Sequence, residues 1–153
     1  MKEYLFNPFN IKNKNEKDLQ AMYQNTFSKM IEEPNSMYEY ATNIEVYSNL
    51  NYIIGEIIAR LTRDIINIKT KIEINKAIEM VEQRKLWLKV NTDKPPAMVY
   101  FEALGVRSCQ SDINTLADKE CSLKRFKNAY NSISEKINAL KKKMESIKFE
   151  EFE

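Results

Sequence analysis

The residues best suited to chemistry lie in one stretch, EQRKLWLKVNTDKPPAMVYFEALG, which spans residues 82–105. Trp87, the only tryptophan, is preceded by Arg84 and Lys85 and followed by Lys89. Cations of this kind pair with phosphates, and a flat ring can stack on an unpaired base. The pattern therefore predicts a contact with single-stranded nucleic acid. Burial of Trp87 in a core is the alternative, and it is the commoner outcome for a single tryptophan.

The charges of the chain are unevenly distributed. Residues 59–148 contain nineteen Lys and Arg against eleven Asp and Glu, whereas residues 1–58 contain five against eight. A solvated basic surface without a ligand would explain such an excess, but cations without an acidic residue three or four positions away on their helix are available to phosphates. Arg63, Lys71 and Arg84 meet this criterion. With the basic stretch around the tryptophan included, we expect the nucleic-acid-binding residues to be Arg63, Lys71, Arg84, Lys85, Trp87 and Lys89.

The residue types exclude several classes of catalytic site. The chain has no histidine, which removes His-based acid–base catalysis and Cys/His zinc sites. We interpret Cys109 and Cys121 as small apolar residues of helices in a protein from a reducing compartment. Two pairs of glutamates have the spacing Glu-x-x-Glu: Glu79 with Glu82, and Glu150 with Glu153 in the tail. They leave a metal site made only of carboxylates as an alternative, but no further ligand residue lies near either pair in the sequence. We expect a protein that is not an enzyme and that uses no metal or other cofactor.

The cations require a long helix to position them, and that helix is predicted to begin after Ser36. Ser36 and Glu39 have the spacing of a capping box, in which each side chain satisfies a backbone N–H at the start of a helix. Alternating spacings of four and three then predict a heptad seam: Tyr40, Ile44, Tyr47, Asn51, Ile54, Ile58, Leu61, Ile65, Ile68 and Ile72. Asn51 is a polar member of the kind that fixes register or oligomer state. Beyond this seam the apolar pattern moves to Ile74, Ile78 and Val81.

Two further helices are predicted after the basic stretch. Asp93 is expected to cap a short helix that has Pro95 and Pro96 in its first turn and Gly105 as its C-terminal cap. An unbroken alternation of three and four positions predicts one long C-terminal helix through Leu116, Lys119, Leu123, Phe126, Tyr130, Ile133, Ile137, Leu140, Met144 and Ile147.

Together these patterns predict an all-α fold in which long helices form an antiparallel hairpin or coiled coil with a Pro-Pro elbow. Two glycines and four prolines are too few for a turn-rich β fold. The expected boundaries are an aromatic, Asn-rich arm with a short helix (1–35), a helical core (36–148) and an acidic tail (149–153). Because the seams are continuous, we expect a homo-oligomer that associates through Ile54, Ile58, Leu61, Ile65, Tyr130, Ile137 and Leu140.

The chain is expected to be soluble and cytoplasmic, with no membrane partner. Its isoleucine-rich stretch is interrupted by charged residues and falls short of the roughly 18 apolar residues that span a bilayer. The apolar part of the N-terminus is also too short for a secretory signal.

A long helix opening with SMYEYATNIEVYSNLNYIIGEIIARL is followed by a basic stretch, a linker and a terminal helix, LADKECSLKRFKNAYNSISEKINALKKKME. This order of parts, over residues 36–148, resembles small phage recombination mediators of the UvsY type. The resemblance implies a helical homo-oligomer in the host-cell cytoplasm that binds single-stranded DNA. It also implies that the protein helps load a RecA-like recombinase in place of a single-strand-binding protein. The alternative function is a coiled-coil structural, scaffolding or assembly protein without nucleic-acid binding.

Overall fold

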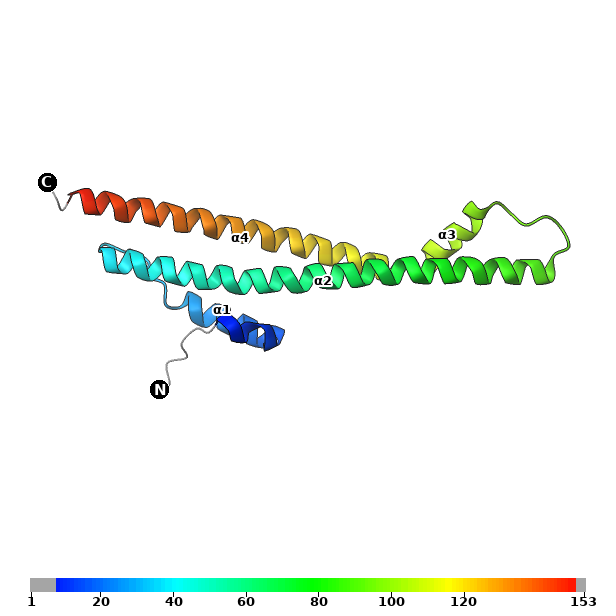
Figure 1. Ribbon diagram of the computed structural model, residues 1–153, viewed down its shortest axis with the longest axis horizontal. Coiled ribbons are helices and arrows are strands. Elements are labelled where there is room, and N and C mark those ends of the chain that lie inside the picture. The colour runs from blue at the N-terminus through cyan, green and yellow to red at the C-terminus, as the bar shows by residue number, and fades with distance from the viewer. Residues whose placement is uncertain (1–7, 151–153) are drawn as a thin grey trace. The chain divides into compact units, whose positions relative to one another are not determined.

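A computed structural model describes residues 8–150, with the side chains of residues 11–148. Over these residues the protein is all-α, as the sequence predicts (Figure 1). A 3₁₀ helix η1 (Pro8–Asn13) precedes the α-helices α1 (Glu16–Phe27), α2 (Met37–Val90), α3 (Met98–Ser108) and α4 (Gln110–Glu150). The chain forms two compact units: unit 1 comprises Met1–Ala59 and Lys124–Glu153, and unit 2 comprises Arg60–Leu123. Helices α2 and α4 therefore contribute to both units, and so does the predicted core of 36–148.

Helix α2 begins at the capping box that the sequence predicts. The backbone N–H of Glu39 donates to Ser36 Oγ at 3.3 Å, and the backbone N–H of Ser36 donates to Glu39 Oε2 at 3.2 Å. Glu39 Oε2 also accepts from the backbone N–H of Asn35 at 2.9 Å. The pKa of Glu39 is lowered, chiefly by this Asn35 bond; desolvation opposes the shift, and the two hydrogen bonds with Ser36 lower the pKa further. The sequence signal for the start of α2 is thus confirmed.

In unit 1, α2 carries an apolar side that the heptad seam does not include. Ile53 packs with Ile11 of η1 and Leu19 of α1, and all three side chains are buried. The short helix that the sequence predicts is present as α1, and Asn15 caps it by accepting from the backbone N–H of Asp18 at 2.8 Å. Because consecutive residues of a helix are about 100° apart, Ile53 lies beside the seam residue Ile54. Helix α1 therefore covers a second side of α2.

Also in unit 1, the predicted seam of α2 packs on the predicted seam of α4. Ile54 and Ile133 are buried in one apolar cluster, and Ile58 and Ile137 pack against it. Asn51 Nδ2 donates to Ser134 Oγ at 2.9 Å, and Ser134 Oγ donates to the backbone carbonyl of Tyr130 at 2.9 Å. The polar seam residue therefore finds its partner within the chain.

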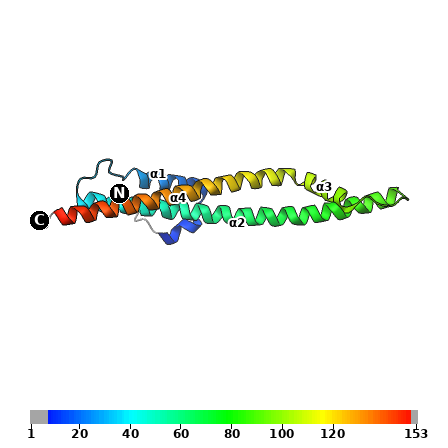
Figure 2. The ribbon, with the colours of Figure 1, turned by 90° about the horizontal axis from the view of Figure 1, so that it is seen from above.

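The two helix segments of unit 1 run antiparallel. The ammonium of Lys136 lies 5.7 Å from the ring centre of Tyr47, one turn before Asn51, whose partner Ser134 lies earlier in α4 than Lys136. Residues that come earlier in α2 thus meet residues that come later in α4, and both views show these segments side by side (Figures 1 and 2).

In unit 2, α3 differs from the short helix predicted from the sequence. It begins at Met98, its N-cap Ala97 makes no side-chain cap bond, and Pro95 and Pro96 lie in the connection before it. The predicted cap residue, Asp93, is also in this connection.

Gly105 lies inside α3 and is buried, so its predicted role as the C-terminal cap is wrong. A Cβ at Gly105 would stand 2.8 Å from the backbone carbonyl oxygen of Lys76 on α2. The missing side chain therefore permits a close helix–helix approach rather than a left-handed turn.

Unit 2 also corrects the predicted shift of the α2 seam. Ile74, Ile78 and Val81 are about half exposed. The partly covered side instead mixes polar and apolar side chains, among them Lys76, Met80, Gln83 and Trp87. The apolar pattern locates an apolar line on this helix, but it does not show which side α3 and α4 cover.

Cross-helix ion pairs join α2 to α4 in unit 2. Lys119 Nζ lies 2.8 Å from Asp64 Oδ2, and Lys69 Nζ lies 2.8 Å from Glu120 Oε1. Lys119 is the cation that interrupts the otherwise apolar seam of the C-terminal helix. Its ion pair with Asp64 explains why a lysine is tolerated at that position.

Candidate functional site

Four of the predicted binding residues share one side of α2 in unit 2. Arg63, Lys71, Lys85 and Lys89 are all exposed. At about 100° per residue they fall within about 80° of one another, and at 1.5 Å per residue they extend over ~39 Å. We call these four side chains the basic face. They form a line of positive charge on one continuous helix, suited to an extended polyanion.

The other two predicted residues, Arg84 and Trp87, lie on a different side of α2. Trp87 is two residues from Lys85 and from Lys89, about 200° around the helix, but only about 60° from Arg84. Its side chain is half-buried, and it belongs to the side that also carries Gln83. The six residues that the sequence predicts as one site are therefore divided between two sides.

Lys71 has an acidic partner on another helix. Its Nζ lies 2.9 Å from Asp112 Oδ1 on α4. The side chains are 58% and 27% exposed, so solvent screens the pair and it is weak. A phosphate could replace this carboxylate. Arg63, Lys85 and Lys89 form no ion pair with the residues that the structure describes.

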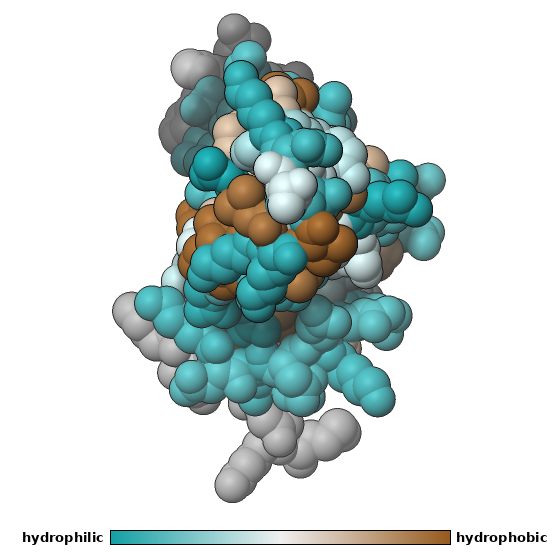
Figure 3. Space-filling model, turned by 90° about the vertical axis from the view of Figure 1, so that its right-hand side faces the viewer, coloured by the Kyte–Doolittle hydropathy of each residue, from teal (hydrophilic) through white to brown (hydrophobic). Residues whose placement is uncertain are grey.

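A line of apolar side chains lies among the cations of the basic face. Ile74, Ile78 and Val81, with Leu88 one heptad after Val81, are 48–53% exposed. We call these four residues the apolar stripe. Figure 3, which views the molecule from the end at which α2 stops, shows apolar side chains at the surface of that end among hydrophilic ones. Half-exposed apolar residues at heptad spacing mark a side that another molecule can cover.

The residues predicted to join copies into an oligomer are placed mostly inside one chain. Ile54, Ile58 and Ile137 belong to the apolar cluster of unit 1, and Ile65 is buried in unit 2. Leu61 is partly covered and Tyr130 is 39% exposed. Leu140 lines a groove that is described next. Association through this seam stays a prediction, and it would have to compete with contacts that already exist.

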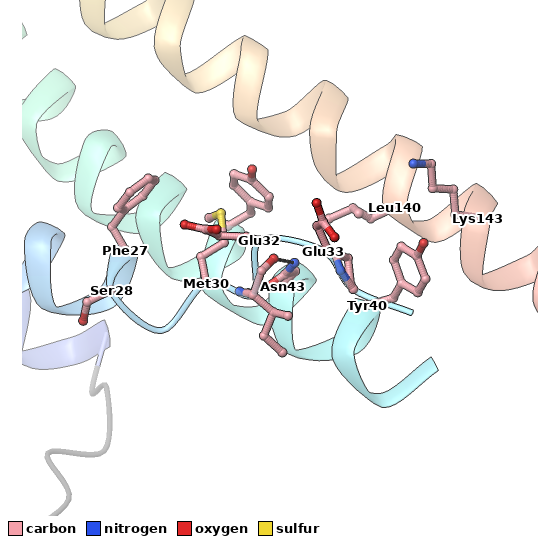
Figure 4. A pocket seen from close by; sticks show the side chains of 12 residues that line it. Phe27, Ser28, Met30, Glu32, Glu33, Tyr40, Asn43, Leu140 and Lys143 are labelled. Atoms are coloured by element: carbon pink, nitrogen blue, oxygen red, sulfur yellow. Dashed lines mark hydrogen bonds between the residues drawn. The ribbon is translucent and has the colours of Figure 1, made fainter. Parts of the chain in front are cut away.

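Unit 1 contains a groove of about 590 Å³ at the start of α2. Its apolar wall includes Phe27, Met30, Tyr40 and Leu140. Glu32 and Glu33 enter it from the segment between α1 and α2, and Lys143 stands over it from α4 (Figure 4). We call this hollow the acidic groove.

The segment that carries the two glutamates is fixed by a buried asparagine. Asn43 of α2 is 3% exposed; its Oδ1 accepts from the backbone N–H of Ile31 at 2.8 Å, and its Nδ2 donates to the carbonyl of Ile31 at 2.8 Å. The sequence analysis did not predict the groove. A signal for it was present in Glu32-Glu33-Pro34, which ends the first helix within the acidic part of the chain, residues 1–58. The contact between Asn43 and Ile31 is long-range in sequence and left no periodic pattern.

Comparisons with known proteins give no relative for this chain: no protein-family model, curated protein or solved structure matches it. Within residues 8–150, no helix combines the length and the apolar character that crossing a membrane requires.

Proposed function

We propose that the protein binds single-stranded nucleic acid along the basic face of α2. The observation that carries this proposal is the alignment of Arg63, Lys71, Lys85 and Lys89 on one exposed side of one helix. Three of these cations have no ion pair with the described residues, and the fourth has a screened one. Each is therefore available to neutralise a phosphate.

A single strand fits this face better than a duplex for two reasons. The cations form one narrow line, which matches one backbone. The apolar stripe lies among them, and Ile74, Ile78 and Val81 can contact the apolar faces of bases that a single strand leaves unpaired. A duplex hides those base faces, so it would meet only the cations.

The resemblance to recombination mediators extends this proposal to a biological role. In that role the protein is a phage recombination mediator or accessory protein that binds single-stranded DNA and assists loading of a RecA-like recombinase in place of a single-strand-binding protein. It acts as a homo-oligomer of antiparallel helical hairpins in which the Pro95–Pro96 segment is the elbow. The cytoplasm of the host cell is the expected location.

The test is a titration of labelled oligo(dT) at several salt concentrations, with and without Lys85→Ala and Lys89→Ala together. Each lost phosphate contact lowers the slope of log affinity against log salt by ~0.7, so the double variant should lose ~1.4. Lys124→Ala with Lys127→Ala is the matched control, because both lysines are exposed on α4, outside the basic face. Wild-type affinity and slope in the first variant would reject the basic face as the site.

A second candidate function is a structural or assembly protein, and the apolar stripe favours it. Ile74, Ile78, Val81 and Leu88 repeat at heptad spacing, as in helices that pair with a partner helix. This function predicts no salt-dependent binding of oligo(dT). Ile78→Asp would then abolish binding to the partner helix and leave the stability of the isolated chain nearly unchanged, because the side chain is already half exposed.

A further inference from the structure

The acidic groove of unit 1 contains two carboxylates without a partner. Glu32 and Glu33 are exposed, and neither forms an ion pair or a hydrogen bond with the residues that the structure describes. They stand beside an apolar wall that includes Met30 and Leu140, as Figure 4 shows. An occupant of this groove should therefore present an apolar surface with two cations next to it.

The end of α2 in unit 2 presents such a surface. Lys85 and Lys89 are four positions apart, as are Leu86 and Val90, so two cations and two apolar side chains form adjoining rows on one side of the helix. Leu86 is 53% exposed and Val90 is 82% exposed. Neither lysine has an ion pair with a described residue. We call these four side chains the terminal face of α2.

We propose that the acidic groove of one copy binds the terminal face of α2 of a second copy. Leu86 and Val90 would cover the apolar wall, and Lys85 and Lys89 would pair with Glu32 and Glu33. The remaining charges agree with this arrangement. Lys143 at the groove and Glu82, which precedes Leu86 by one turn, provide a further pair of opposite sign.

A second copy is the occupant that the complementary charges favour. Each chain presents one acidic apolar hollow and one basic apolar helix end, and the two match in sign as well as in hydrophobicity. The contact joins two different surfaces, so it is head-to-tail, and every copy that uses its groove still offers its terminal face. This association does not depend on nucleic acid or on the proposed function.

The experiment is sedimentation velocity of the full chain, without nucleic acid, over a range of protein concentrations. Wild type should show a mass that rises with concentration. A groove variant, Glu32→Lys with Glu33→Lys, and a terminal-face variant, Lys85→Glu with Lys89→Glu, should each sediment with the mass of one chain. An equimolar mixture of the two variants should regain association, because an acidic surface then meets a basic one at every contact.

The controls are charge reversals of the same size at exposed positions elsewhere. Glu102→Lys with Glu135→Lys matches the groove variant, and Lys124→Glu with Lys127→Glu matches the terminal-face variant. Both controls should associate as the wild type does, and circular dichroism should show equal helix content for all the proteins. A wild type that is monomeric at every concentration overturns the proposal. So does association that survives in either charge-reversal variant, or a mixture that remains monomeric.

Discussion

The two glycines of the chain give matched perturbations with opposite expected outcomes. Gly105 lies inside α3, and a Cβ there would stand 2.8 Å from the carbonyl oxygen and 3.0 Å from Cγ of Lys76. Gly55 lies inside α2, and a Cβ there would stand 3.8 Å from Cε2 of Tyr130, an ordinary contact distance. The same substitution, Gly→Ala, therefore meets backbone in unit 2 and an ordinary van der Waals contact in unit 1.

The magnitudes follow from two opposing effects. In a helix interior alanine is more favourable than glycine by about 1 kcal/mol, so Gly55→Ala should raise the free energy of unfolding by about that amount. At Gly105 the new carbon must move about 0.5 Å from the Lys76 carbonyl to reach a usual C···O distance. Overpacking of this kind costs about 1–3 kcal/mol, which exceeds the gain in helix propensity. Gly105→Ala should therefore be less stable than Gly55→Ala by about 1–3 kcal/mol.

Urea unfolding followed by circular dichroism measures these free energies, and thiol labelling shows where α3 moves. Cys109 follows Gly105 by one turn, is buried, and its thiol donates to the carbonyl of Ile72 at 3.8 Å, whereas Cys121 is exposed. Gly105→Ala should speed the labelling of Cys109 severalfold and leave the rate at Cys121 unchanged. The reasoning is refuted if Gly105→Ala is stabilised as much as Gly55→Ala, or if Cys109 stays as protected as in the wild type.

Three further predictions follow from the local geometry. Because Trp87 is half-buried and lies away from the basic face, Trp87→Ala should destabilise the protein by about 1–3 kcal/mol in thermal unfolding, while the salt slope of oligo(dT) binding stays the same. Asn43→Ala leaves the N–H and carbonyl of Ile31 without partners and should cost about 2 kcal/mol or more in urea unfolding, whereas Asn49→Ala, the control at a partly covered position, should cost less. The pKa of Glu39 is lower in the folded than in the unfolded protein. The contribution of its carboxylate to the free energy of unfolding is therefore complete above about pH 4.3 and is lost as the pH falls through the folded pKa. Glu39→Gln should weaken this dependence on acid in unfolding curves measured between about pH 2 and 6.

The control for Asn43→Ala is a second asparagine of α2. Asn49 is on the same helix but is only partly covered, and no hydrogen bond of its side chain joins it to the described residues. A loss of stability in Asn49→Ala equal to that in Asn43→Ala would contradict the role given to the Ile31 contact. The comparison thus separates the two hydrogen bonds of Asn43 from the general effect of removing an amide from α2.

The parts of the fold that the sequence predicted depend on local or periodic signals. The hydrogen bonds between Ser36 and Glu39 lie within one turn, so these four consecutive residues are enough to predict the start of α2. The C-terminal seam is a regular alternation, and its members are partly or fully covered apart from Tyr130. A repeat of apolar residues shows which of them share a side of a helix. Helix α4 has a single apolar side, so the repeat also predicts which side is buried.

The parts that the sequence did not predict depend on contacts between distant residues. Glycine is common at the C-terminal cap of a helix, which is why the sequence predicts that role for Gly105. Glycine is required there because the Lys76 carbonyl of another helix leaves no room for a side chain. Lys71 has no acidic residue three or four positions away on its own helix, and its partner Asp112 lies on α4. Arg84 and Trp87 are close to Lys85 in the chain, yet the helix turns them to another side. Proximity in sequence was the wrong measure for a site on a helix.

The two proposed contacts use the same lysines, and this links them. Lys85 and Lys89 bind phosphate in the proposed nucleic-acid complex, and they pair with Glu32 and Glu33 of another copy in the proposed assembly. One ammonium cannot fully satisfy both partners, so a strand bound at this end of α2 removes the surface that the acidic groove recognises. By thermodynamic reciprocity, self-association must then weaken nucleic-acid binding by the same factor. If both proposals hold, the acidic groove competes with the strand for these lysines, and an assembly built on the groove releases its contacts as the basic face is occupied.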